Sequence, residues 1–190
     1  MTIDLNRCVG CQTCTVACKH ANDTLPEVQW RRVLDVETGT FPDVQRLFLV
    51  TGCQHCAEPP CVDVCPTGAS FVRDDGIVLV DKHICIGCRY CMMACPYKAR
   101  SFIHEELSDQ RPHAPRGKGT VESCTFCVHR VDRGRTPACV EACSEAGHGA
   151  LIFGDMKDAN SELAKRLEQV PNRQVREDLG LDTGVRYHGI

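Results

Sequence analysis

The sequence predicts an α+β fold made of short helices and short strands connected by loops. The first observation is the cysteine content, 16 of 190 residues, arranged in four separate groups. The second is that three of these groups lead into a short apolar stretch typical of a strand, at Phe71, at Phe102 and at 150–153. The third is an aromatic content of only 5%. Such a chain needs something besides side-chain packing to organise its interior, and bound cofactors fit that role.

Charge and hydropathy argue against several classes of protein. The formal net charge is −3, which argues against nucleic-acid binding. No stretch approaches the roughly 18 consecutive apolar residues of a membrane helix, so we expect no direct membrane span. Residues 1–11 lack the basic and apolar regions that direct export. We therefore expect a cytoplasmic chain, in which so many cysteines are more typical of metal ligands than of disulfides.

The spacing inside the cysteine groups is specific. Groups one and three read C-x2-C-x2-C-x3-C, and group three continues into Pro96. This is the pattern of bacterial ferredoxins that hold two [4Fe–4S] clusters. Group two lengthens its middle gap, and group four lengthens it further. The groups are Cys8, Cys11, Cys14 and Cys18; Cys53, Cys56, Cys61 and Cys65; Cys85, Cys88, Cys91 and Cys95; and Cys124, Cys127, Cys139 and Cys143.

The spacing has a physical reason. Three cysteines separated by two residues allow one tight loop to wrap three corners of an iron–sulfur cube. The fourth cysteine, three residues further on, points to a different cube, and in two-cluster ferredoxins it completes the other cluster. The groups must therefore pair, and the chain repeats a ferredoxin-like unit.

Zinc binding, disulfide bonding and thiol catalysis fit the cysteines less well. Structural zinc takes two cysteines from each of two separate knuckles and does not need triplets. A disulfide framework needs an oxidising compartment and an export route, and the sequence indicates neither. Catalytic thiol chemistry would require a cysteine that stands apart from the groups, and none does.

The order of the groups and the segments between them resemble a known family. It is the four-cluster iron–sulfur subunit of the dimethyl sulfoxide reductase class, with relatives in polysulfide, thiosulfate, tetrathionate and arsenate reductases. The resemblance covers roughly residues 1–155. It departs after Cys143, where the family usually has proline and a short turn and this chain has a glycine-containing loop, 144–150. The segments that carry the resemblance are Trp30, 39–42, 53–56, 59–61, 124–127 and 137–139.

The resemblance implies how the groups pair. Groups one and four, and groups two and three, would form two ferredoxin-like dicluster units related by internal pseudo-symmetry. The first unit would comprise 1–40 and 111–155, and the second 41–110. Four [4Fe–4S] clusters are implied, with the ligands Cys8, Cys11, Cys14 and Cys143 (cluster 1); Cys18, Cys124, Cys127 and Cys139 (cluster 2); Cys53, Cys56, Cys61 and Cys95 (cluster 3); and Cys65, Cys85, Cys88 and Cys91 (cluster 4).

Segments outside the groups predict further elements. We expect strands over 44–50 and 77–80, the second after a turn at 74–76. Residues 105–120 are expected to form a loop that could contact a partner. The stretch 160–168 predicts a capped helix with Leu163 and Leu167 on one face. Residues 171–190 are expected to form an extended tail, and we assign 156–190 as a helix and tail in possible contact with a partner.

Charged and imidazole side chains near the groups are candidates for a supporting role. Positive charge near a cluster favours its reduced form and raises its potential. We interpret His55 and His129 as side chains next to the ligands or at the surface, since neither occupies a ligand position. The basic candidates are Arg7, Lys19, Lys82, Arg89, Lys98, Arg100 and Arg130.

The resulting hypothesis is an electron relay without a catalytic residue of its own. The resemblance implies two partners, a catalytic molybdopterin-type subunit and an integral membrane quinone-reactive subunit, in a respiratory complex that acts on a sulfur compound. The chain would then lie at the inner face of the cell membrane through a partner, with co-export alongside a signal-bearing partner as the alternative. Two other functions stay open: a subunit of a molybdenum-free sulfur-metabolism complex, and a free-standing polyferredoxin.

Overall fold

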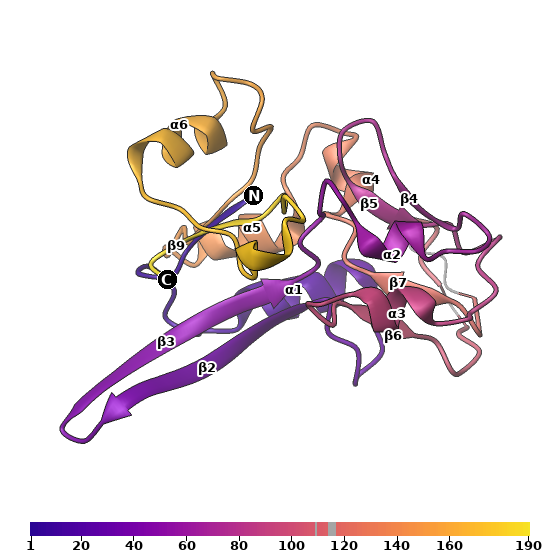
Figure 1. Ribbon diagram of the computed structural model, residues 1–190, viewed down its shortest axis with the longest axis horizontal. Coiled ribbons are helices and arrows are strands. Elements are labelled where there is room, and N and C mark those ends of the chain that lie inside the picture. Colours follow the sequence, from indigo (N-terminus) through magenta and orange to yellow (C-terminus); the bar gives the residue numbers. More distant parts are fainter. Residues whose placement is uncertain (109, 114–116) are drawn as a thin grey trace.

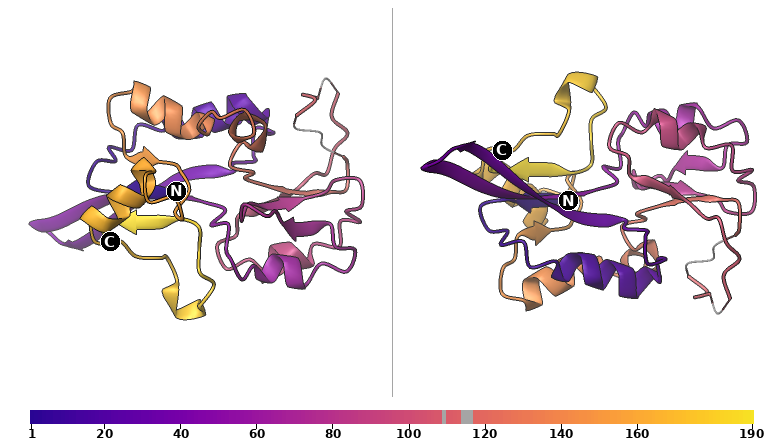
Figure 2. Two further views of the ribbon diagram at one scale, coloured as in Figure 1. Left: turned by 90° about the horizontal axis from the view of Figure 1, so that it is seen from above. Right: turned by 90° about the horizontal axis from the view of Figure 1, so that it is seen from below.

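Two pairs of short helices organise the fold, and the computed structural model describes residues 1–108, 110–113 and 117–190. Helix α1 (Thr13–Asn22) packs on α5 (Ala138–Glu145), and α2 (Pro60–Asp63) packs on α3 (Tyr90–Ala94). The two pairs lie in different halves of the molecule (Figure 2). Residues far apart in the sequence thus become neighbours in the first pair.

A three-stranded sheet supports the α1–α5 half. Its order is β8 (Leu151–Ile152), β1 (Thr2–Asp4) and β9 (Arg186–His188). Strand β1 runs antiparallel to β8 and parallel to β9. The segment predicted as an extended tail therefore contributes a strand to the sheet beside the N-terminal strand.

The β2–β3 hairpin is the longest regular feature. Strands β2 (Arg31–Thr40) and β3 (Asp43–Gly52) pair antiparallel along their whole length, and the hairpin extends as an arm from the rest of the molecule (Figure 1). The strand predicted over 44–50 lies inside β3, which confirms it, whereas its partner β2 was not predicted. The unit boundary expected after residue 40 falls inside this hairpin.

Two smaller hairpins cover the α2–α3 half. Strand β4 (Ser70–Val72) pairs with β5 (Val78–Val80), and β6 (Arg100–Phe102) pairs with β7 (Val121–Ser123). The strands expected at Phe71, Phe102 and 150–153 are confirmed as β4, β6 and β8. The turn at 74–76 is also present, closed by the Gly76 amide donating to the Arg73 carbonyl at 2.8 Å.

The remaining helices are α4 (Val128–Val131), α6 (Glu162–Gln169) and the 3-10 helix η1 (Glu177–Leu179). Helix α6 confirms the prediction over 160–168: the Ser161 hydroxyl accepts a hydrogen bond from the Ala164 amide, and Leu163 is fully buried. The loop predicted over 105–120 has no helix or strand in its described part, and residues 109 and 114–116 lie outside the described residues. No helix in the part of the chain that the structure describes has the length and apolar character needed to cross a membrane.

Cysteine side chains form a large part of the interior. Ile3, Leu151 and Tyr187 from the three-stranded sheet join Trp30 in the larger core, together with cysteines of groups one and four. Val78 and Val121 form a smaller core with Cys61 and Cys91. The architecture is a mixed α/β fold in which sulfur atoms occupy places that apolar side chains fill in an ordinary domain.

Candidate metal centres

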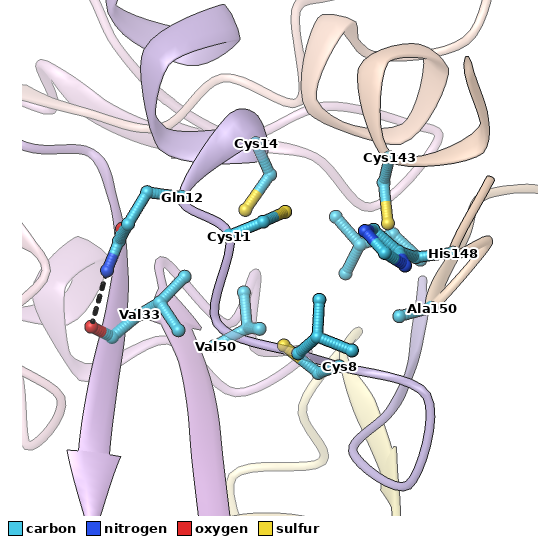
Figure 3. Close-up of a pocket in the computed structure, with 11 residues that line it drawn as sticks. Cys8, Cys11, Gln12, Cys14, Val33, Val50, Cys143, His148 and Ala150 are labelled. Atoms are coloured by element: carbon cyan, nitrogen blue, oxygen red, sulfur yellow. Dashed lines mark hydrogen bonds between the residues drawn. The ribbon is translucent and has the colours of Figure 1, made fainter. Parts of the chain in front are cut away.

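Three cysteines of group one meet the last cysteine of group four around one cavity. Cys8, Cys11, Cys14 and Cys143 line this cavity. Their sulfur atoms point toward this space from the loop before α1, from α1 and from α5 (Figure 3). His148 lies on the same wall as Cys143.

Groups two and three exchange their fourth cysteines in the same way. Cys95, the last cysteine of group three, shares a cavity with the first three of group two. Cys65, the last of group two, shares a cavity with the first three of group three. The two sets are Cys53, Cys56, Cys61 and Cys95; and Cys65, Cys85, Cys88 and Cys91.

The fourth set is the most buried one. The thiol of Cys18 in α1 is close enough to Cys124, Cys139 and Cys127 to interact with them electrostatically. All four side chains are buried. The Asn22 side-chain amide donates to Cys18 Sγ at 3.7 Å and to Cys127 Sγ at 3.9 Å. One amide group therefore joins sulfur atoms from groups one and four.

Helix pairing explains why the cysteines converge in this way. Helix α1 carries Cys14 and Cys18 one turn apart, and α5 carries Cys139 and Cys143 with the same spacing. Because α1 packs on α5, each helix presents one cysteine to each of two neighbouring sites. Helices α2 and α3 serve the other half similarly but are shorter: Cys61 lies inside α2 and Cys91 inside α3, while Cys65 and Cys95 follow the ends of these helices.

The thiols are arranged for a cofactor larger than one ion. Among the described residues, no three or more Cys, His, Asp or Glu side chains are placed to hold a single metal ion. A zinc site would bring its sulfur atoms to about 2.3 Å from one point. A [4Fe–4S] cube instead takes one thiolate at each of four irons, so its ligands stand further apart. The four sets suit the cube.

Backbone amides are also directed at the sulfur atoms. The Ser70 amide donates to Cys65 Sγ at 3.4 Å, and the Phe126 amide donates to Cys124 Sγ at 3.5 Å. Positive φ angles at Gly10 and Gly87 turn the loops of groups one and three around their cavities. Such amide–sulfur contacts stabilise negative charge on a cluster.

Comparison with known proteins agrees with this geometry. Residues 44–156 match the family model described as the 4Fe-4S dicluster domain. A tetrathionate reductase subunit of Salmonella typhimurium is 45% identical, over 100% of this chain and 72% of that protein. The Hdr-like menaquinol oxidoreductase iron-sulfur subunit 1 of Archaeoglobus fulgidus is 42% identical, over 98% and 81%. A selenate reductase subunit of Mesobacillus selenatarsenatis is 38% identical, over 98% and 70%.

The chain belongs to the 4Fe-4S dicluster family of reductase iron–sulfur subunits. Its cofactors are [4Fe–4S] clusters, and its sixteen cysteines suffice for four of them. As in other members of this family, its task is electron transfer. The resemblance deduced from the sequence is confirmed.

Burial shapes the chemistry of the thiols in this family member. Burial raises the pKa of Cys14 to about 11 and the pKa values of Cys53 and Cys56 to about 12. Hydrogen bonds from Thr13 instead lower the pKa of Cys11, an exposed cysteine. A buried thiol of raised pKa stays protonated at neutral pH without metal, so the binding of iron must displace its proton.

The supporting residues expected from the sequence differ in their placement. The Lys19 ammonium donates hydrogen bonds to backbone carbonyls of the loop 25–28. Arg100 does contact a sulfur atom, because its Nη2 donates to Cys61 Sγ at 3.1 Å. Sequence reasoning missed Arg31, which lies far from any cysteine along the chain yet donates to Cys139 Sγ at 3.8 Å. This contact joins residues 108 positions apart, so no local sequence pattern indicates it.

The two histidines next to ligands each stack on another ring. His55 is buried, stacks on Phe126 at 3.7 Å and accepts a hydrogen bond from the Val78 amide at 3.1 Å through Nδ1. Burial lowers its pKa to about 3, so the ring is neutral. His129 stacks on His113 at 3.9 Å. Neither ring lines a cysteine cavity in place of a thiol, although His55 borders the site of Cys53 and Cys56.

Proposed function

We propose that this chain holds four [4Fe–4S] clusters through crossed ligand sets and relays electrons between two partner subunits. The observation that carries the proposal is that three thiols of one group meet the fourth thiol of its partner group. The proposed ligands are Cys8, Cys11, Cys14 and Cys143; Cys18, Cys124, Cys127 and Cys139; Cys53, Cys56, Cys61 and Cys95; and Cys65, Cys85, Cys88 and Cys91.

The proposal groups these sites into two dicluster units related by pseudo-symmetry. The α1–α5 pair serves groups one and four, and the α2–α3 pair serves groups two and three. In each pair, one helix carries at least one cysteine of an unlengthened group and the other carries at least one cysteine of a lengthened group. The matching roles of the two pairs support a common ancestry of the two units.

The chain's own residues hold the clusters and exclude water. When bound, a [4Fe–4S] cluster accepts and releases single electrons. Apolar side chains such as Val33 and Val50 line the first cavity beside the thiols. Two of the sixteen cysteines, Cys11 and Cys88, are exposed, and they belong to different halves. An electron donor and an electron acceptor would therefore approach from different sides.

We propose that the partners are a catalytic molybdopterin-type subunit and an integral membrane subunit that reacts with quinone. Support comes from relatives that are named as subunits of tetrathionate and selenate reductases. The chain itself would be peripheral to the inner face of the cell membrane, attached through the membrane partner. Co-export with a signal-bearing catalytic partner would place it on the opposite face.

Purification from the native cells tests this assignment. A tagged copy of the full chain, extracted from membranes with mild detergent, should co-purify with a molybdenum-containing protein and a membrane protein. Its mass on gel filtration should far exceed the 21.0 kDa of the chain. A cluster-bearing monomer near that mass would overturn the complex and leave a free-standing polyferredoxin.

One relative favours a second candidate function. The Archaeoglobus fulgidus relative, at 42% identity, is named as part of an Hdr-like menaquinol oxidoreductase. In this second case the chain serves a molybdenum-free complex with a heterodisulfide-reductase-like or haem-bearing partner. Metal analysis of the purified complex distinguishes the two candidates, since molybdenum supports the first and haem without molybdenum supports the second.

A further inference from the structure

Among the residues that the structure describes, two arginines are buried, one in each half. Arg31 is 2% exposed and Arg100 is 6% exposed. Each is the first residue of its strand, Arg31 in β2 and Arg100 in β6. Arginine is among the residue types least often fully buried, and a buried guanidinium usually has a partner of opposite charge.

The guanidinium of Arg31 lies among sulfur atoms. Its Nη2 donates to Cys139 Sγ at 3.8 Å and to Met1 Sδ at 3.3 Å, while its Nε has no hydrogen-bond partner among the described residues. Burial lowers the pKa of Arg31, but negative charge on Cys139, Cys124 and Tyr187 raises it overall. The guanidinium is thus placed to interact with the sulfur ligands once they are bound as thiolates.

Arg100 has the corresponding place in the other half. Its Nη2 donates to Cys61 Sγ at 3.1 Å, and its Nη1 donates to the Ser70 hydroxyl at 2.6 Å. Arg100 also interacts electrostatically with Cys53 of the same site and, across the helix pair, with Cys91 of the neighbouring site, but its largest interaction is with Cys61. Cys61 and Cys139 are equivalent, because each is the third cysteine of a group with lengthened spacing.

The ion pairs of the described residues do not include either guanidinium. Among the residues that the structure describes, no Asp or Glu forms a salt bridge with Arg31 or Arg100. Arginine stays charged in proteins. A buried charge without a counter-charge is strongly destabilising, so the negative charge of the sulfur ligands must compensate for it.

We propose that Arg31 and Arg100 are fixed positive charges that raise the reduction potentials of the two sites whose sulfur atoms they contact. For Arg31 this is the site of Cys18, Cys124, Cys127 and Cys139. For Arg100 it is the site of Cys53, Cys56, Cys61 and Cys95. The inference rests on the ligand sets of the proposed function.

The direction of the effect follows from electrostatics. Reduction adds one negative charge to a cluster, and a nearby positive charge stabilises this form more than the oxidised one. The interaction is strong because the surroundings are buried and have a low effective dielectric constant. Arg46 provides a contrast on the same hairpin, since it is exposed and forms its ion pair with Asp35.

The test compares charge-removing and charge-keeping variants of the full chain, purified without oxygen. R31M and R100M remove the charge, R31K and R100K keep it, and R46M is the control. Iron and acid-labile sulfide are counted first, and each cluster signal is then titrated by electron paramagnetic resonance at set potentials. R31M should lower the ratio of reduced to oxidised cluster about tenfold for one signal, which for one electron corresponds to about 59 mV. R100M should do so for a different signal.

The lysine variants should shift these signals much less, and R46M should shift none. Unchanged potentials in R31M and R100M with full iron would overturn the inference and leave the ligand sets intact. Loss of one cluster in a methionine variant would also overturn it, because the arginine would then be needed for assembly and not for the potential. A wild-type chain without labile sulfide would instead overturn the proposed function itself.

Discussion

The hydroxyl of Tyr187 donates a hydrogen bond to the carbonyl of Val50 at 3.0 Å and accepts one from the Gln54 side-chain amide at 3.0 Å. These contacts tie the C-terminal strand β9 to the end of β3 and to the loop of group two. Close by, Cys56 forms an isolated β-bridge with Thr183. The C-terminal segment thus braces a cysteine loop that begins more than half the chain earlier.

Replacing Tyr187 by Phe should weaken this brace. The substitution removes the hydroxyl that bonds the Val50 carbonyl and the Gln54 amide, although this amide keeps the Gly52 carbonyl as an acceptor at 3.2 Å. We expect the loss to cost about 1–3 kcal/mol. The measurement is the rate at which the cluster absorbance bleaches in guanidinium under argon, and Y187F should bleach faster than wild type. Tyr90, which is 54% exposed, provides the control variant Y90F. Equal rates in Y187F and Y90F would contradict the role of the brace.

Gly87 should be required for the site of Cys85, Cys88 and Cys91. A Cβ at this position would lie 2.0 Å from the Gly119 carbonyl oxygen, and its φ of +69° adds about 1–2 kcal/mol of strain for any other residue. We expect G87A to lose about four irons, one cube, per chain. Gly68 has the same φ but open space around it, so G68A should keep its iron. If G87A also keeps all its iron, the close approach is not needed.

Lys19 should matter for the loop that follows α1 and not for cluster potentials. Its ammonium donates to the carbonyls of Leu25 at 2.7 Å, Pro26 at 3.2 Å and Val28 at 2.9 Å. Removing these charge-assisted bonds in K19M should destabilise the chain by about 1–3 kcal/mol, measured as a lower thermal midpoint of cluster loss. The redox titration of K19M should match that of the exposed control K165M. If a cluster potential shifts in K19M and not in K165M, this prediction is wrong and Lys19 does affect the potential of a cluster.

Cluster binding should strengthen as the pH rises through the neutral range. Without metal, burial keeps Cys14 protonated, with a pKa of about 11, and Cys53 and Cys56 likewise, with pKa values of about 12. Since the bound form is the thiolate, each of these thiols releases a proton when iron binds. Iron retained against a fixed excess of chelator, corrected for the chelator's own pH dependence, should therefore fall as the pH is lowered. Retention that does not change with pH would contradict the raised pKa values.

Many features of the fold could be predicted from local sequence patterns. The four groups follow from cysteine spacing, and the strands β4, β5, β6 and β8 follow from short apolar stretches after turns. Helix α6 follows from the capping residues at its start and from the spacing of Leu163 and Leu167, which places them on one face. Each of these features depends on residues close together in the chain, which is why a single sequence suffices to predict it.

Long-range contacts could not be predicted in this way. Strand β9 is short, and its place beside β1 depends on pairing across nearly the whole chain. The burial of Arg31 likewise depends on α5, which brings Cys139 to it. The sequence over 171–190 contains no strong strand pattern, so it predicts an extended tail. The strand β9 in this segment depends on its pairing with β1.

The most direct test is the iron and acid-labile sulfide content of the full chain, purified from its own cells without oxygen. Four cubes require about sixteen irons and about sixteen sulfides per chain. That result would support the use of all sixteen cysteines as cluster ligands. A content near twelve of each, or zinc without sulfide, would contradict it.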